Sequence, residues 1–370
     1  MKLKKHHYFF FFVGFLFLGI TSVKLFSDGM FMDGLWYADI SRNMAKGLGS
    51  FWKPHLSYGI FNEFYEHPPL ALGLQSLFFR FFGDSIYIER FYSLFTYITT
   101  GYLIVLIWGK LTNNKRNAWI PLFLWITITG IAWAAANNML ENTMSIFVCL
   151  SVLFYFNSSR KNHFIWIFFS GISLSLGLLT KGFFCLYIWG IPFFMWLFKR
   201  KQSFIQMSID TFVLIFSTIL PIVLLYCFVP AAQNNMICYF KKQVVGSIQN
   251  VQTVNTRFEI IIIFAKRVIP PLIISTIAIL IALKHKVEKR LLKINQKEAL
   301  IFMAIVFSGI IPIMISMKQR SFYILTVYPL FALGLAYYIY PMLNIIIEKI
   351  NPNTKGFKIF KIITILIVIS

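Results

Sequence analysis

Apolar runs that each approach twenty residues recur along this chain of 370 residues and limit what it can fold into. A helix needs about 20 consecutive apolar residues to cross a bilayer, and a soluble core of this size could not bury so many runs of that length. Hydrophobic residues make up 58% of the chain. The sequence therefore predicts an all-α, polytopic membrane protein.

Eleven runs predict membrane spans, and the last of them reaches the final residue, Ser370. The predicted spans cover residues 8–26, 87–109, 118–136, 142–157, 164–180, 183–198, 209–229, 268–283, 299–316, 323–340 and 359–370. Most connections are short, but 27–86 and 230–267 are long. Long loops on a scaffold of short loops usually carry function. We therefore expect a single transmembrane domain over 1–370 whose chemistry lies in these two loops.

The distribution of charge predicts the orientation in the membrane. With the N-terminus in the cytoplasm, 21 of the 35 Lys and Arg residues fall on the cytoplasmic side, and nine of the 13 Asp and Glu residues fall on the outer side. Basic residues favour the cytoplasmic side, so both long loops are predicted to lie outside. This topology also accounts for the net charge of +22. Because no nucleic-acid-binding motif accompanies the basic residues, we expect the bilayer as a partner and no nucleic acid.

Acidic residues are concentrated in and just after the first long loop. Seven of the 13 fall there: Asp28, Asp33, Asp39, Glu63, Glu66, Asp84 and Glu89. In so hydrophobic a chain, this concentration of carboxylates marks the first loop as the predicted active face. The loop also has helical apolar spacing over 36–47 and 70–82, which predicts two amphipathic helices lying in the membrane interface.

An ordered set of short motifs follows the first span. Asp33 begins an Asp-x-x-x-Tyr-Ala-x-Ile-Ser-Arg pattern that ends at Arg42, and Glu66-His67-Pro68-Pro69 comes next. Weaker matches are Glu141, Thr180-Lys181-Gly182 and the segment 318–323. Together these motifs resemble the bacterial branch of the protein-mannosyltransferase and aminoarabinose-transferase superfamily, which are membrane glycosyltransferases of the GT-C type.

The resemblance implies a GT-C fold in the inner (plasma) membrane and an inverting glycosyl transfer at its outer face. A hexose or pentose would pass from a polyprenyl-phosphate carrier to a lipid, glycan or protein acceptor. Direct displacement needs a base for the acceptor hydroxyl and cations for the departing phosphate. Members of the family often continue with further spans or an outer domain, and the sequence leaves open whether this chain is complete at Ser370.

The resemblance assigns roles to individual residues. Asp33 is the predicted base, because it lies a few residues beyond span one and is held at the membrane boundary; a helix-capping Asp is the alternative. Lys181, Lys318 and Arg320 are predicted to receive the phosphate, with anchoring to lipid headgroups as the alternative. The remaining predicted substrate-binding residues are Tyr37, Arg42, Glu66, His67, Glu141 and Tyr323.

A divalent metal ion is the one cofactor that the residues suggest. Glu66 and His67 offer an oxygen and a nitrogen ligand, and related enzymes are associated with a metal that bridges the two outer loops through a His of the second loop. The second loop of this chain contains no His. The other interpretation is that Glu66 pairs with a cation or with the acceptor.

Two residues depart from the aminoarabinose branch, and one other class of function stays open. Trp36 stands where that branch carries an Arg, and His67 where it carries a Lys. The loss of both cations favours a hexose-type transferase over transfer of aminoarabinose to lipid A. The alternative function is a transporter or flippase of a lipid-linked glycan. Transporters tend to place ionisable residues and broken helices near the middle of the membrane, whereas most charges here lie at span ends.

Overall fold

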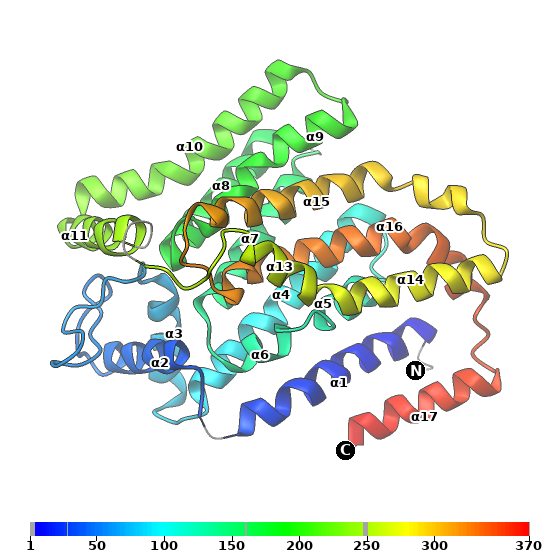
Figure 1. Cartoon of the computed structure of the whole chain (residues 1–370), viewed down its shortest axis with the longest axis horizontal. Helices are drawn as coiled ribbons and strands as arrows, with labels where there is room; N and C mark the ends of the chain where they lie inside the picture. The colour runs from blue at the N-terminus through cyan, green and yellow to red at the C-terminus, as the bar shows by residue number, and fades with distance from the viewer. Residues whose placement is uncertain (1–3, 28, 160, 247–250, 370) are drawn as a thin grey trace.

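The computed structural model describes residues 4–27, 29–159, 161–246 and 251–369, so Asp28 of the acidic group lies outside the described residues. The described chain is a bundle of helices that run along one common direction (Figure 1). Two isolated β-bridges, Gly49 to Pro54 and Ser57 to Phe61, shape the first long loop. The predicted all-α polytopic fold is confirmed.

Within the described residues, seven helices are long and apolar enough to cross a membrane. Five of them are single α-helices: α1 (Lys5–Phe26), α4 (Ile88–Thr112), α7 (Leu140–Asn157), α8 (His163–Lys181) and α10 (Phe204–Phe228). Two are composite: α15 (Gln296–Ile310) continues into η4 (Ile311–Ile315), and η5 (Ser321–Val327) continues into α16 (Tyr328–Lys349). An eighth is a pair bent by 45°, α13 (Glu259–Arg267) and α14 (Ile269–Lys284).

The other three predicted spans form shorter pieces. They are α5 (Trp119–Ile126) with α6 (Ile131–Ala136), η1 (Phe183–Gly190) with α9 (Ile191–Lys199), and α17 (Lys355–Ile369). Gly130 explains the break before α6, because its φ of 101° is not helical. A Cβ at Gly130 would also lie 2.6 Å from the guanidinium group of Arg267. A count of apolar residues detects neither the φ of Gly130 nor its close approach to Arg267.

Burial separates the centre of the bundle from its edge. In α7, 67% of the most apolar 18-residue window is buried inside the protein, whereas in α1 and α10 the share is 17%. Helix α7 packs against α4 on one side and α8 on the other, so it is the central helix. Large apolar side chains such as Phe212 and Phe228 of α10 are exposed, as expected for a helix that faces lipid.

The two long loops gather at one end of the bundle (Figure 1). There α2 (Met32–Ala45) and α3 (Leu70–Phe82) pack against each other and against the start of α7, around Tyr37, Ile40, Leu72 and Leu140. Helix α3 has the predicted bounds, while α2 begins four residues before the predicted 36–47. The first turn of α2 holds Asp33 and Gly34, which the apolar spacing does not register.

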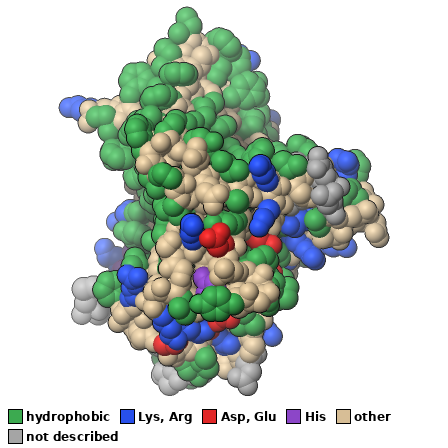
Figure 2. Space-filling view, turned by 90° about the vertical axis from the view of Figure 1, so that its left-hand side faces the viewer, with side chains coloured by type: hydrophobic (Ala, Val, Ile, Leu, Met, Phe, Trp, Pro, Cys, Tyr) green, Lys and Arg blue, Asp and Glu red, His purple; other side chains and the backbone are tan. Residues whose placement is uncertain are grey.

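The second long loop lies on the first. It begins with α11 (Pro230–Tyr239) and the π-helical turn η2 (Phe240–Val245). The side-chain amide of Asn234 donates to the hydroxyl of Tyr65 at 3.2 Å, and that of Asn235 to the carbonyl of Trp52 at 3.0 Å. Seen from this end, acidic and basic side chains gather below a largely hydrophobic upper part (Figure 2).

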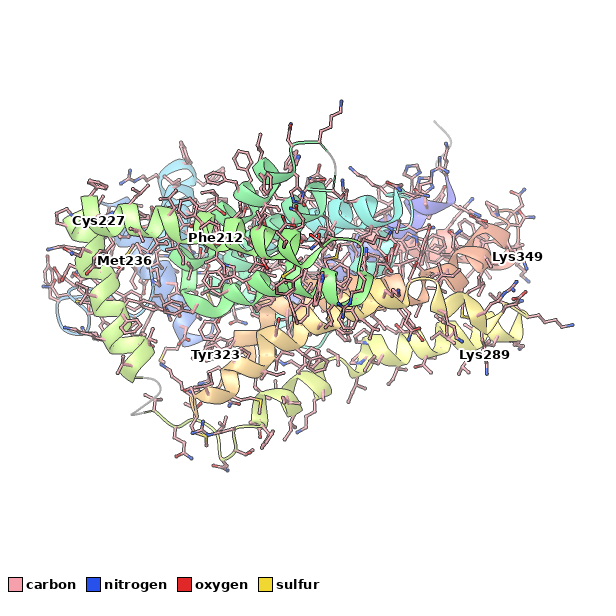
Figure 3. All side chains as sticks on the ribbon, turned by 90° about the horizontal axis from the view of Figure 1, so that it is seen from above. Phe212, Cys227, Met236, Lys289, Tyr323 and Lys349 are labelled. Atoms are coloured by element: carbon pink, nitrogen blue, oxygen red, sulfur yellow. The ribbon has the colours of Figure 1, made fainter. Side chains whose placement is uncertain are left out.

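The opposite end carries the connections that the charge count places in the cytoplasm. Lys289 and Lys349 lie there, at the far end from Cys227 and Met236 (Figure 3). Helix α1 begins at this same end of the bundle, and α17 starts beside it (Figure 1). The predicted loops therefore alternate between the two ends of the bundle, in agreement with the directions of the helices.

Candidate active site

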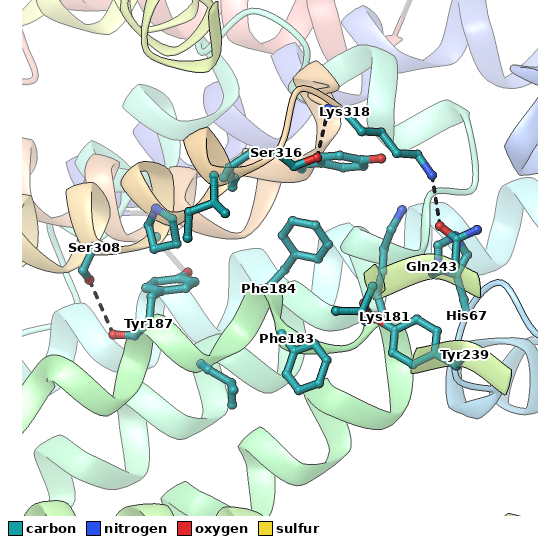
Figure 4. Close-up of a pocket in the computed structure, with 17 residues that line it drawn as sticks. His67, Lys181, Phe183, Phe184, Tyr187, Tyr239, Gln243, Ser308, Ser316 and Lys318 are labelled. Atoms are coloured by element: carbon teal, nitrogen blue, oxygen red, sulfur yellow. Dashed lines mark hydrogen bonds between the residues drawn. The ribbon is translucent and has the colours of Figure 1, made fainter. Parts of the chain in front are cut away.

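A cavity of about 500 Å³ opens at the end of the bundle that carries the long loops. Its apolar wall comes mainly from η1 and the α15–η4 helix, through residues that include Phe183, Phe184, Leu186, Pro312 and Ile313. Polar groups gather at one end, where Lys181 and Lys318 lie on either side of the cavity with His67, Tyr239 and Gln243 close by (Figure 4). The cavity is thus polar at one end and apolar along the rest.

Lys181 is the best-enclosed cation of the site. It is the last residue of α8, and its Nζ lies 2.6 Å from the Oε1 atom of Glu141, with both side chains at most 2% exposed. Its ammonium group also lies over the rings of Phe322 and Tyr323, at 5.1 and 5.6 Å from their centroids. An ion pair in such surroundings is poorly screened by water, so its two charges interact more strongly than they would at the surface.

Lys318 faces Lys181 from the short connection between η4 and η5. Its Nζ donates a hydrogen bond of 3.0 Å to Oε1 of Gln243, which belongs to the second outer loop. Burial lowers the pKa of Lys318, and the negative charge of Glu66 partly offsets this, whereas the positive charge of Lys181 adds to it. The two ammonium groups therefore act on each other across one cavity, while the Glu141 carboxylate lies against that of Lys181.

Asp33 lies in the first turn of α2 and is half-buried. The N-terminus of a helix favours a carboxylate, because unpaired backbone N–H groups point out of it. Burial raises the pKa of Tyr37 well above its usual value, and the negative charge of Asp33 is the second cause. The charge of Asp33 also acts on Glu66 and on Lys318. The predicted base therefore shares one electrostatic environment with the polar end of the cavity.

His67 lines the cavity as a neutral imidazole. Burial lowers its pKa well below the ordinary value, and the positive charges of Lys181 and Lys318 lower it further. Its ring lies edge-on to that of Tyr37, with the centroids 5.7 Å apart, and its Nδ1 atom is buried without a hydrogen-bond partner among the described residues. Burial raises the pKa of the neighbouring Glu66. A substrate hydroxyl is the kind of group that would satisfy Nδ1.

The predicted metal site has too few ligands among the described residues. Across the described ranges, no group of three or more His, Cys, Asp or Glu side chains is placed to hold a metal ion. Glu66 and His67 supply two ligands, whereas a catalytic zinc ion usually takes three from the protein and calcium takes six or more oxygens in all. The described residues do not fit the implied ion, and the metal hypothesis stays a prediction without a ligand set.

Two predicted substrate-binding cations lie apart from the cavity lining. Arg42 is held by acids of the first loop and α4: its guanidinium group lies 2.6 Å from Asp39, 2.7 Å from Asp84 and 3.7 Å from Glu89. Arg320 is exposed, and its charge acts on Lys318. A role for either residue in binding substrate stays a prediction.

Some cavity residues carry no signal that sequence reasoning could use. Tyr239 and Gln243 of the second loop were not predicted, although Lys241 and Lys242 lie between them. The π-helical turn that contains Gln243 is a form found frequently at functional sites, but a sequence pattern does not reveal it. The aromatic residues Phe183, Phe184 and Tyr187 fall within a predicted span and could not be separated from ordinary span residues.

The chain resembles known proteins over different parts of its length. The family described as dolichyl-phosphate-mannose-protein mannosyltransferase matches residues 66–240. An undecaprenyl phosphate-alpha-4-amino-4-deoxy-L-arabinose arabinosyl transferase of Wigglesworthia glossinidia brevipalpis is 27% identical over 48% of this chain and 31% of its own length. The transferase of the same name from Shewanella sediminis is 24% identical over 44% and 30%. The matches thus span about a third of these curated relatives.

Two solved structures share the fold. ArnT from Cupriavidus metallidurans bound to undecaprenyl phosphate superposes with a TM-score of 0.64 at 16% identity, covering 95% of this chain and 62% of that one. The archaeal oligosaccharyltransferase AglB from Archaeoglobus fulgidus gives a TM-score of 0.52 at 12% identity, covering 99% and 54%. Together, the family match, the curated relatives and the shared fold confirm the predicted resemblance to the protein-mannosyltransferase and aminoarabinose-transferase superfamily of GT-C membrane glycosyltransferases.

Proposed function

We propose that this chain is an inverting glycosyltransferase that moves a sugar from a polyprenyl-phosphate carrier to an acceptor at the outer face of the membrane. The observation that carries the proposal is the cavity with an apolar wall and two lysines at one end. A polyprenyl phosphate has the same division, since an apolar chain ends in an anionic head. Apolar pockets with a few placed polar groups are the usual form of a ligand site.

The residues at the polar end divide the chemistry between them. Asp33 takes the proton of the acceptor hydroxyl as its oxygen attacks the anomeric carbon of the donor sugar. The bond from that carbon to the carrier phosphate breaks, and Lys181 and Lys318 stabilise the negative charge that the phosphate gains. A single displacement from the opposite face inverts the anomeric centre. Tyr37, Glu66 and His67 orient the sugar or the acceptor.

The proposal includes the orientation in the membrane. We place the N-terminus in the cytoplasm and the cavity at the outer face of the inner (plasma) membrane, because basic residues are in excess at the other end of the bundle. Carrier and sugar then approach the cavity from the bilayer, and the acceptor approaches over the loop that contains Asp33.

The experiment is a transfer assay with purified protein in nanodiscs and a panel of radiolabelled polyprenyl-phosphate hexoses and pentoses. We expect one donor to lose its sugar. Asp33→Asn should reduce that release by about 100-fold or more, because it removes the base at nearly constant shape. Asp39→Asn is the matched control: it changes the same residue type in the same helix, and the Asp39 side chain is half-exposed and bound to Arg42.

Other outcomes would contradict the proposal. Near-normal turnover by Asp33→Asn would remove this residue from the mechanism. If no donor reacts, and the protein instead moves a lipid-linked glycan across the bilayer of a proteoliposome, then a transporter is the better description of this chain.

A further inference from the structure

The turn that joins α6 to α7 holds the N-terminus of α2 in place. The side chain of Asn137 accepts a hydrogen bond of 2.7 Å from the backbone N–H of Phe31, the residue that precedes α2. The side chain of Asn138 donates to the carbonyl of Gly34 at 3.1 Å. These two contacts fall on either side of Asp33. The predicted base is therefore anchored just before and just after its own position.

The contact with Gly34 is too close for any other residue. A Cβ atom at Gly34 would lie 2.1 Å from the backbone oxygen of Asn137 and 2.9 Å from the Sδ atom of Met30. Atoms at such separations overlap, so a side chain at Gly34 would force α2 and the turn apart. The backbone of α2 thus rests directly on the turn.

Asn138 suits its position through both its backbone and its side chain. Its φ of 49° lies in the left-handed region, which Asn tolerates better than most residues with a side chain. It is 3% exposed, and its amide also donates to Oε1 of Gln75 on α3 at 3.2 Å. The same Gln75 oxygen accepts from the hydroxyl of Ser41 on α2 at 3.1 Å. One buried network therefore joins the turn to both helices of the first loop.

The turn leads directly into the other half of the site. Helix α7 begins at Leu140, and its first turn holds Glu141, the partner of Lys181. Asp33 and Glu141 are thus both placed by the first turns of helices, and residues 137–138 connect those two turns. A displacement of this connection would move the base relative to the cation that receives the phosphate.

From this geometry, and resting on the proposed function, we infer that Asn137, Asn138 and Gly34 are positioning residues that set Asp33 relative to the Glu141–Lys181 pair. We call the three residues the asparagine clamp. None of them lines the cavity, so the clamp acts through Asp33 and leaves carrier binding unchanged. A misplacement of about 1 Å at a reacting group can cost about 100-fold in rate.

The test separates turnover from binding. Asn138→Asp keeps the shape and the left-handed preference but sets an acceptor opposite the oxygens of Gly34 and Gln75. Asn138→Gly also keeps the backbone conformation and removes only the side-chain donor. We expect kcat for sugar transfer to fall about 10- to 100-fold in Asn138→Asp and less in Asn138→Gly, with the dissociation constant for undecaprenyl phosphate within about twofold of wild type. The matched control is Asn162→Asp, an exposed residue at φ 64°.

Hydrogen exchange provides a readout that does not depend on activity. Amides of residues 31–37 should exchange faster in Asn138→Asp than in wild type, while those of α8 stay unchanged. Equal kcat in wild type and Asn138→Asp would overturn the clamp and leave the transferase intact, as would a loss of carrier binding in parallel with kcat. A wild-type protein that releases sugar from no donor would instead overturn the proposed function, and the clamp with it.

Discussion

At the scale of single residues, the buried pair of Glu141 and Lys181 is expected to affect both stability and transfer activity. A mutation of one partner cannot separate these two effects. Lys181→Met leaves a carboxylate buried without its partner, which should cost about 3–5 kcal/mol of stability. The double variant Glu141→Gln/Lys181→Met removes both charges and should recover most of the melting temperature. We expect transfer activity to stay absent in both, because neither offers the cation to the phosphate.

Melting curves in detergent, run beside the transfer assay, distinguish these effects. Lys199→Met is the control for the general loss of a lysine paired with a glutamate, since Lys199 lies 3.1 Å from Glu298 and its side chain is 20% exposed. If the double variant regains activity together with stability, Lys181 does not contact the phosphate and its role is structural.

The burial of Lys318 predicts that affinity for undecaprenyl phosphate changes with pH in the alkaline range. Burial lowers its pKa, so it loses its charge at a lower pH than an ordinary lysine. Affinity for undecaprenyl phosphate depends on the charged form and should therefore fall as pH rises through this lowered pKa. Lys318→Arg should bind the carrier without that fall, because a guanidinium stays protonated. Binding isotherms from pH 6.5 to 10 check this, and an identical fall in the arginine variant would assign the titration to another group.

Sequence reasoning at this scale singles out charges at the ends of apolar runs and residues of the matched motifs. Lys181, Lys318, Tyr323 and His67 all line one cavity, although the chain places them far apart. Sequence reasoning misses Tyr239 and Gln243, because their position depends on how the second loop folds onto the first. The roles of all these residues stay predictions until turnover is measured.

At the scale of elements, the end of α8 depends on a glycine. Gly182 has a φ of 81°, and a Cβ there would lie 1.9 Å from the hydroxyl oxygen of Tyr239. Gly182→Ala should therefore suffer both backbone strain, about 1–3 kcal/mol, and a steric clash. Gly83→Ala is the matched control, because Gly83 also follows a helix, has a φ of 89° and has no atom of the described residues within 4 Å of its Cβ position.

The difference in melting temperature between these two alanine variants measures the close approach alone. Gly182→Ala should melt lower than Gly83→Ala, and the added change Tyr239→Phe should narrow the gap because it removes the clashing oxygen. Equal melting temperatures for the two alanine variants would show that α11 moves away from α8 without cost.

Hydropathy along the sequence predicts where helices lie, but it does not predict whether a helix is continuous. The bounds of α3 were predicted because its apolar face is regular, and the run 118–136 was predicted as one span because its composition is apolar throughout. Its break depends on the φ of Gly130 and on the position of Arg267, which comes from a distant part of the chain. Such breaks are properties of the packed bundle.

At the scale of the whole molecule, the helix directions place the described loops between the long helices at two ends, and labelling can assign each end to a side of the membrane. In a variant without its four cysteines, Tyr58→Cys lies in the first loop, where Tyr58 is 84% exposed, and Lys289→Cys lies in an exposed connection at the other end. A charged maleimide does not cross the inner membrane. We expect it to label position 58 in spheroplasts and position 289 only after the membrane is opened. The reverse pattern would put the cavity in the cytoplasm and exclude transfer at the outer face, whereas labelling of both positions before opening would show that the inner membrane had leaked and would call for a new preparation.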